Sequence, residues 1–137
     1  MAASRRVLVF GTFDVIHPGH ISFLRQAKKY GDFLIVSLAR EKYIRKIKGQ
    51  SARHSEAERK TLLESLKFVN KVVFGSKTDY LRHIMSIKPS VIVLGYDQKA
   101  FTEKLREKLA ERGLSVKIVR ARAYKPGIYK SSRLKWN

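Results

Sequence analysis

Residues 7–38 have the sequence VLVFGTFDVIHPGHISFLRQAKKYGDFLIVSL, and this stretch determines the fold that we expect. Two short apolar runs, 7–10 and 33–38, flank a segment in which apolar side chains recur at helical spacing. Pro18 lies where a helix can begin, and Gly31 lies where it can end. The pattern predicts a strand, a helix and a second strand, which is the unit from which parallel sheets are built.

The same alternation continues along the chain. Three further apolar runs, at 72–74, 91–94 and 116–119, predict strands, and helical patterns lie between them. Ser55 and Glu58 have the spacing of a capping box at the start of one of these helices. Five short strands that alternate with helices indicate an open parallel α/β sheet with helices on both faces.

Two helix boundaries and one loop complete this outline. Thr78 or Asp79 is expected to cap the helix that precedes the fourth strand, and the last helix is expected to end at Gly113. Residues 40–54 are basic and show no clear period, so we expect a loop there. Open parallel sheets bind ligands beyond the carboxyl ends of their strands, and we expect a site in the loops after the first, second and fourth strands.

The composition is typical of one soluble domain. The chain has 137 residues, of which 44% are hydrophobic and 30% are charged, and we expect a single domain over residues 1–137. It contains no cysteine, which excludes thiolate catalysis and zinc–sulfur sites. No apolar run approaches the roughly 18–20 residues of a membrane span, and the N-terminus does not resemble a signal peptide. We therefore expect a cytoplasmic protein with no membrane partner.

The charge points to an anionic partner. Lysine and arginine total 30 against 11 aspartate and glutamate, which gives a formal net charge of +19. Nucleic acid, a membrane surface and phosphorylated small molecules are all partners that such a charge suits. Tyr124, Tyr129 and Trp136 lie among basic residues, as in some nucleic-acid-binding segments. The chain shows no recognised nucleic-acid-binding motif, however, and we rank that class below an enzyme.

The loop after the first strand, GTFDVIHPGH at 11–20, has several features that suit phosphate binding. Gly11 allows the chain to turn, and Pro18 and Gly19 open a helix whose N-terminal N–H groups and dipole attract an anion. His17 and His20 are three residues apart and face one side of the helix start. Two imidazoles at this place suit displacement at the α-phosphorus of a nucleotide, with pyrophosphate as the leaving group and no covalent enzyme intermediate.

Two other interpretations of these histidines remain open. Histidines near a helix start are often surface or capping residues. A metal site built from Asp14, His17 and His20 is also conceivable, although our favoured interpretation has no metal ligand in the chain.

The stretch GTFDVIHPGH resembles the signature GTFDxxHxGH of the cytidylyltransferase-like nucleotidyltransferases, and the resemblance covers nearly the whole chain. It implies one Rossmann-like domain with three α/β/α layers and a five-stranded parallel sheet. It also implies that Thr12 and Phe13 contact the nucleotide and that Asp14 shapes the loop. The phosphates would be held, and the transition state stabilised, at the helix start by His17, Pro18, Gly19 and His20.

Other positions match the family in the loops that follow. Lys46 and Lys48, in IRKIKG, resemble lysines that meet substrate phosphates, the second with a catalytic role; a solvated basic loop is the alternative. Arg59 matches an arginine that reaches the active site, and an exposed helix arginine is the alternative. Asp97, in LGYDQ, resembles an aspartate that contacts the ribose or base, and an ordinary turn residue is the alternative.

The C-terminal stretch YKSSRL, at 129–134, resembles a degraded form of the family motif I-S-[ST]-[ST]-x-I. The resemblance implies that Ser131 and Ser132 bind phosphates. Tyr129, Lys130 and Leu134 depart from the motif. Arg120 or Arg122 corresponds to a further family arginine.

Within the family, the chain resembles the archaeal type of FAD synthetase in three stretches: KIKG, VFGS and LGYDQ. That group implies transfer of an adenylyl group from ATP to FMN, with a divalent cation, normally Mg²⁺, and often a homodimer. One departure is the absence of the cysteines that the group carries near the C-terminus. The alternative within the family is a CTP-dependent cytidylyltransferase that acts on glycerol 3-phosphate or another polyol phosphate.

Overall fold

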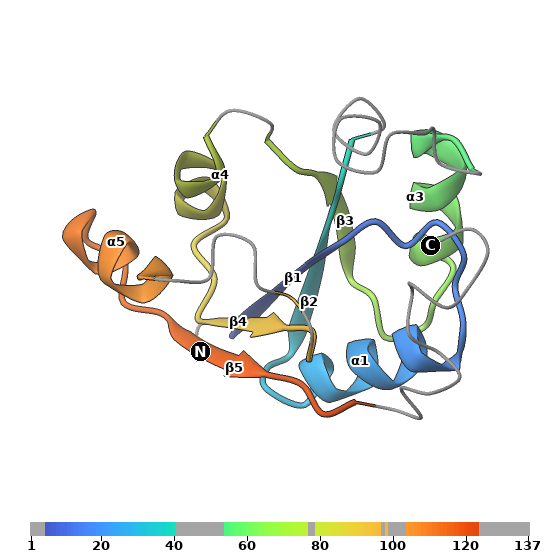
Figure 1. Cartoon of the computed structure of the whole chain (residues 1–137), viewed down its shortest axis with the longest axis horizontal. Helices are drawn as coiled ribbons and strands as arrows, with labels where there is room; N and C mark the ends of the chain where they lie inside the picture. The colour runs from blue at the N-terminus through green and yellow to red at the C-terminus, as the bar shows by residue number, and fades with distance from the viewer. Residues whose placement is uncertain (1–4, 41–53, 77–78, 97, 99–103, 124–137) are drawn as a thin grey trace.

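The computed structural model describes residues 5–40, 54–76, 79–96, 98 and 104–123. Strands and helices alternate through these residues, as the sequence predicts (Figure 1). The strands are β1 (Arg6–Gly11), β2 (Phe33–Leu38), β3 (Lys71–Phe74), β4 (Val91–Leu94) and β5 (Lys117–Arg120). The helices are α1 (Pro18–Lys28), α3 (Glu56–Glu64), α4 (Tyr80–Ile87) and α5 (Leu105–Glu111).

The five strands form one parallel sheet in the order β3-β2-β1-β4-β5. The chain runs outward from β1 through β2 to β3, and then returns to the other side of β1 to add β4 and β5. The order therefore reverses between β1 and β4. In open α/β sheets, ligands bind beyond the carboxyl ends of the strands at such a point. The predicted Rossmann-like class is confirmed.

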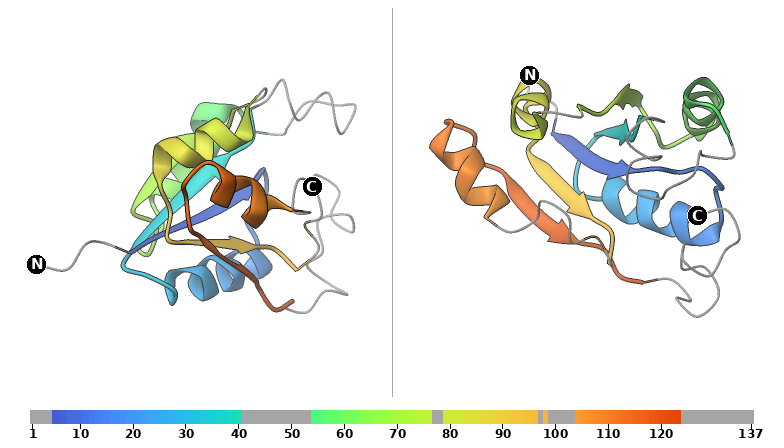
Figure 2. Two further views of the ribbon diagram at one scale, coloured as in Figure 1. Left: turned by 90° about the vertical axis from the view of Figure 1, so that its left-hand side faces the viewer. Right: turned by 45° about the horizontal axis from the view of Figure 1, so that its top comes forward.

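Each face of the sheet has its own hydrophobic core, because successive side chains of a strand point to opposite faces. Val7, Val9 and Val36 pack on one face with Leu24 of α1 and Leu63 of α3. On the other face of the sheet, the strand residues that point the opposite way pack against α4 and α5. This second core is made of Leu8, Ile35, Ile84, Ile92, Leu94, Leu105, Leu109 and Val116. Figure 2 shows the resulting three layers, with helices on both sides of the sheet.

Local signals predicted the starts of α1, α3 and α4. Helix α1 begins at Pro18, and Ser55 and Glu58 form the expected capping box of α3. Asp79 caps α4, while Thr78, the other candidate cap, lies outside the described residues. The fifth strand begins at Lys117, one residue later than expected. None of the described helices is long and apolar enough to cross a membrane.

The capping box of α3 gives a test of this local stability. The Ser55 hydroxyl accepts from the Glu58 backbone N–H at 3.1 Å, and a Glu58 carboxylate oxygen accepts from the Ser55 N–H at 2.9 Å. We expect Ser55→Ala to lower the free energy of unfolding by about 1 kcal/mol, because one N–H loses its acceptor. Urea denaturation measures the change. Ser55→Asp keeps an acceptor and is the control; equal losses in both variants would contradict the capping role.

Candidate active site

The candidate site lies at the carboxyl edge of the sheet, where the chain leaves β1 and enters α1. The edge is closed by backbone hydrogen bonds between the strand ends: the Ala39 N–H donates to the Gly11 carbonyl at 3.0 Å, and the Gly75 N–H donates to the Leu38 carbonyl at 2.8 Å. The loop at 12–17 therefore begins at a fixed point beside the reversal of strand order.

His17 and His20 cap α1 with their own rings. Nδ1 of His17 accepts from the Gly19 backbone N–H at 3.1 Å, and Nδ1 of His20 accepts from the His17 backbone N–H at 3.2 Å. This is the reciprocal arrangement of a capping box, built from two imidazoles in place of a hydroxyl and a carboxylate. The two rings stack with their centroids 3.8 Å apart. The interpretation of these histidines as capping residues is therefore correct.

Capping also determines what chemistry the imidazoles can perform. A ring nitrogen that accepts a hydrogen bond carries no proton, so in each neutral ring the proton is on Nε2. Burial lowers the pKa of His17 below its usual value, which favours the neutral form. The cap thus uses Nδ1 and makes Nε2 the donor atom of each ring. Capping and phosphate binding would use different nitrogens, and Nε2 of His17 is buried in this structure.

Phe13 packs against the imidazole of His20. Its side chain is buried, and its ring centroid lies 5.2 Å from that of His20 and 6.4 Å from that of Phe23. The backbone of Phe13 has φ of 50°, a left-handed conformation that brings the ring back over Gly11. A Cβ at Gly11 would lie 2.5 Å from this ring, so only glycine fits at that position.

Arg59 ties the loop to the neighbouring strand. Its side chain is fully buried, and Nη1 donates to the carbonyls of Thr12 at 3.0 Å and Ala39 at 2.8 Å. These carbonyls follow the ends of β1 and β2. The alternative of an exposed helix arginine is wrong, because α3 directs Arg59 inward beneath the loop.

Asp14 also anchors the loop. Its carboxylate is buried and accepts from the His54 backbone N–H at 2.7 Å, which joins the first loop to the start of α3. This contact agrees with the expected loop-shaping role. Among the described residues, no group of three or more His, Cys, Asp or Glu side chains could hold a metal ion, which argues against the alternative metal site with His17 and His20.

The turn after β4 contains a residue that sequence reasoning missed. Gln98 accepts from the Gly95 N–H at 2.7 Å and donates to the Phe10 carbonyl at 3.0 Å, so its amide bridges β4 and β1 at the reversal of strand order. Arg120 donates to the carbonyls of Gly95 and Gln98 at 2.8 and 2.6 Å. Of the two candidate arginines, Arg120 is the one that holds this turn. The only sequence signal for Gln98 was its place beside Asp97.

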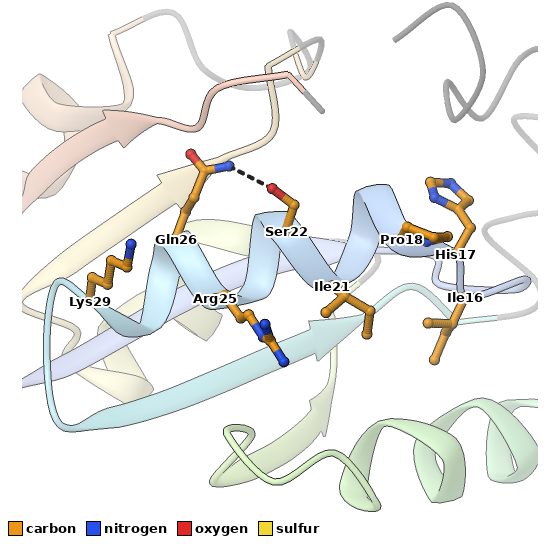
Figure 3. A pocket seen from close by; sticks show the side chains of 8 residues that line it. All are labelled: Ile16, His17, Pro18, Ile21, Ser22, Arg25, Gln26 and Lys29. Carbon is orange, nitrogen blue, oxygen red and sulfur yellow. Dashed lines mark hydrogen bonds between the residues drawn. The ribbon is translucent and has the colours of Figure 1, made fainter. Parts of the chain in front are cut away.

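A groove of about 670 Å³ runs along the outer side of α1, from Ile16 and His17 to Lys29 (Figure 3). Gln26 lies in it, bonded through Nε2 to the Ser22 hydroxyl at 3.2 Å and to the Arg122 carbonyl at 3.0 Å. The Arg122 N–H in turn donates to Oε1 of Gln26 at 2.8 Å. Arg122 thus joins the end of β5 to α1, apart from the turn that Arg120 holds.

The structure brings His17, Pro18, Gly19 and His20 together at the start of α1. In the same loop, Phe13 packs against His20, and Arg59 holds the Thr12 carbonyl. The remaining predicted site residues lie outside the described residues, and their roles stay predictions. They are Lys46, Lys48, Asp97, Ser131 and Ser132.

The family model described as cytidylyltransferase-like matches residues 8–135, which is nearly the whole chain. This protein belongs to the cytidylyltransferase-like family. A protein named FAD synthase from Archaeoglobus fulgidus is 48% identical over 112 residues, which cover 82% of this chain and 80% of the relative. A protein of the same name from Archaeoglobus profundus is 46% identical over 127 residues, which cover 93% and 81%.

One solved structure agrees with this cytidylyltransferase-like fold over its full length. It was solved as a lipopolysaccharide core biosynthesis protein from Thermoplasma volcanium, with a TM-score of 0.84 and 37% identity. The match covers 90% of this chain and all of that one. The name of that protein differs from the names of the curated relatives, although the fold is shared.

The tautomer of the imidazole pair is testable in this cytidylyltransferase-like protein. We expect nitrogen-15 NMR to find the ring protons of neutral His17 and His20 on Nε2. We also expect the pKa of His17 to lie below its usual value of about 6.5, because burial disfavours the charged form. Protonation at lower pH adds a proton to Nδ1 and breaks the cap. The urea-unfolded protein is the reference. A His17 pKa equal in both states would contradict the effect of burial, and a ring proton on Nδ1 of either neutral histidine would contradict the tautomer.

Proposed function

We propose that this protein is an ATP:FMN adenylyltransferase that forms FAD and pyrophosphate. The observation that carries the proposal is the pair of imidazoles that cap the start of α1 through Nδ1. Relatives named FAD synthase from several archaea, 46–48% identical to this chain, support the choice of substrates. An N-terminal helix end with two ring N–H donors suits the phosphates of a nucleoside triphosphate.

The reaction is a direct in-line displacement. A phosphate oxygen of FMN attacks the α-phosphorus of ATP, and a new P–O bond forms as the bond to the β-phosphate oxygen breaks. The electron pair of that bond leaves with pyrophosphate. Donors at Nε2 of His17 and His20 stabilise the negative charge that grows on the α-phosphate oxygens, and their orientation is fixed before the substrate binds.

The remaining predicted residues have complementary roles in this proposal. Lys46 and Lys48 meet the phosphates, Asp97 contacts the ribose or base, and Ser131 and Ser132 bind phosphate oxygens. Mg²⁺ neutralises phosphate charge when bound. The described residues offer no carboxylate cage for it, and Mg²⁺ usually keeps several waters and substrate phosphates as ligands, so we propose that it enters with ATP. A single domain, a cytoplasmic location and a homodimer complete the proposal.

A CTP-dependent cytidylyltransferase acting on a polyol phosphate is the second candidate. It is favoured by the structural neighbour whose name refers to lipopolysaccharide rather than flavin, at 37% identity. Both candidates use the same displacement at an α-phosphorus, and they differ in the base and in the acceptor. A basic nucleic-acid-binding module ranks below both, because the start of α1 with its imidazole pair suits the phosphates of a nucleotide and the relatives are named as enzymes.

A product assay separates these candidates. The protein is incubated with Mg²⁺, with ATP or CTP, and with FMN or glycerol 3-phosphate, and the products are identified by mass. We expect FAD and pyrophosphate from ATP and FMN alone. Formation of CDP-glycerol in place of FAD would support the second candidate. Salt-sensitive binding of oligonucleotides without any turnover would support the nucleic-acid-binding module and contradict an enzyme.

Substitution of the imidazoles tests the mechanism. We expect His17→Ala and His20→Ala each to lower kcat by about 100-fold or more, because each removes a donor to the transition state. Steady-state kinetics gives the loss, and circular dichroism checks that the fold survives. His83→Gln is the matched control, since His83 lies on α4 and bonds to the Ser37 hydroxyl at 2.9 Å. Wild-type turnover in the double His17 and His20 variant would overturn the mechanism.

A further inference from the structure

A cation lies over an aromatic ring at the carboxyl edge of the sheet. The Arg40 guanidinium carbon is 4.8 Å from the ring centroid of Phe74, the last residue of β3. Glu56, at the start of α3, holds the same guanidinium through a contact of 3.6 Å between Nη1 and Oε2. The Arg40 side chain is nevertheless 43% exposed, so a planar cation is held in place while part of it faces solvent.

Arg40 and Phe74 lie at the same edge of the sheet as the loop that carries His17 and His20. Gly11 is in register with Leu38, and Leu38 is in register with Phe74, so the three strand ends lie in a row. Neighbouring strands are about 4.8 Å apart, which places Phe74 about 10 Å along the edge from the end of β1. Phe74 and Phe13 pack against the same core, on the face covered by α1 and α3. The two groups therefore share one edge and one face.

The backbone next to Arg40 and the loop that carries the imidazoles are bonded to the same side chain, Arg59. Arg40 follows Ala39, and the carbonyl of Ala39 shares the Arg59 guanidinium with the carbonyl of Thr12. The backbone beside Arg40 and the backbone at the start of the first loop are thus fixed to one buried side chain.

We propose that Arg40 and Phe74 form a ring shelf that binds the isoalloxazine ring of FMN. The inference rests on the proposed function and names the acceptor subsite within it. A guanidinium that lies over one aromatic ring, in a side chain that is 43% exposed, offers its other face for stacking with a second planar system. The ribityl arm joins the flavin ring to the phosphate, so the two bind at separate places along this edge.

The ring shelf also separates the two candidate acceptors. A polyol phosphate has no planar ring and gains nothing from a stacked guanidinium. Lys60 of α3 lies 5.8 Å from the Phe74 centroid and adds positive charge, but an ammonium group has no plane that stacks on a ring. Stacking therefore depends on Arg40 rather than on charge alone.

Flavin binding by Arg40 variants tests the shelf. Fluorescence anisotropy titrations of full-length protein measure the affinity for FMN and for riboflavin, which has the same ring and no phosphate. We expect Arg40→Ala to weaken both by the same factor, about fivefold or more, and to raise KM for FMN without changing KM for ATP. Arg40→Lys keeps the positive charge but replaces the planar guanidinium by an ammonium group, so we expect it to weaken flavin binding as much as Arg40→Ala does.

Arg25→Ala is the matched control, because Arg25 lies 5.7 Å over Phe68, which precedes β3 and so lies toward the amino ends of the strands. It should leave flavin affinity unchanged. Loss of FMN affinity alone, with riboflavin binding intact, would assign Arg40 to the phosphate and overturn the ring shelf. Wild-type affinity in Arg40→Ala or Arg40→Lys would also overturn it. If the wild-type protein forms FAD in these cases, the proposed function stands; if it neither binds flavin nor forms FAD, both fall.

Discussion

The buried guanidinium of Arg59 is the interaction on which the carboxyl edge depends. A cation removed from water is costly unless its donors are satisfied, and Nη1 of the buried Arg59 donates to the carbonyls of Thr12 and Ala39. Two loops that leave different strands are thereby fixed to one helix, α3. Asp14 adds a second link from the first loop to the start of α3 through the His54 N–H. The first loop is thus held by buried contacts to α3 at two places.

On this fixed loop, the helix cap and the proposed catalytic groups are the same side chains. The caps hold Nδ1 of His17 and His20 as acceptors and so fix both the tautomer and the ring planes. Donors oriented before the reaction need no reorganisation when charge develops, which is the main source of electrostatic catalysis. A serine and glutamate box, such as the one that starts α3, caps equally well but offers no such donors.

The edge has different chemistry on the two sides of β1. Toward β2 and β3 it presents the ring shelf of Arg40 and Phe74, which suits a planar acceptor. Toward β4 and β5, Gln98 and Arg120 form a network of backbone contacts that fixes the turn after β4. The imidazole pair lies at the start of α1, the helix that follows the central strand.

The sequence by itself determined the alternation of strands and helices, the start of α1 at Pro18 and the capping box of Ser55 and Glu58, because these depend on residues no more than a few positions apart. It also predicted the importance of GTFDVIHPGH. Only the tertiary structure decided the strand order, the burial of Arg59, the bridge from Gln98 to a carbonyl 88 residues away and the contact of Arg40 with Phe74. These depend on which distant segments pack side by side, and a local pattern carries no information about that choice.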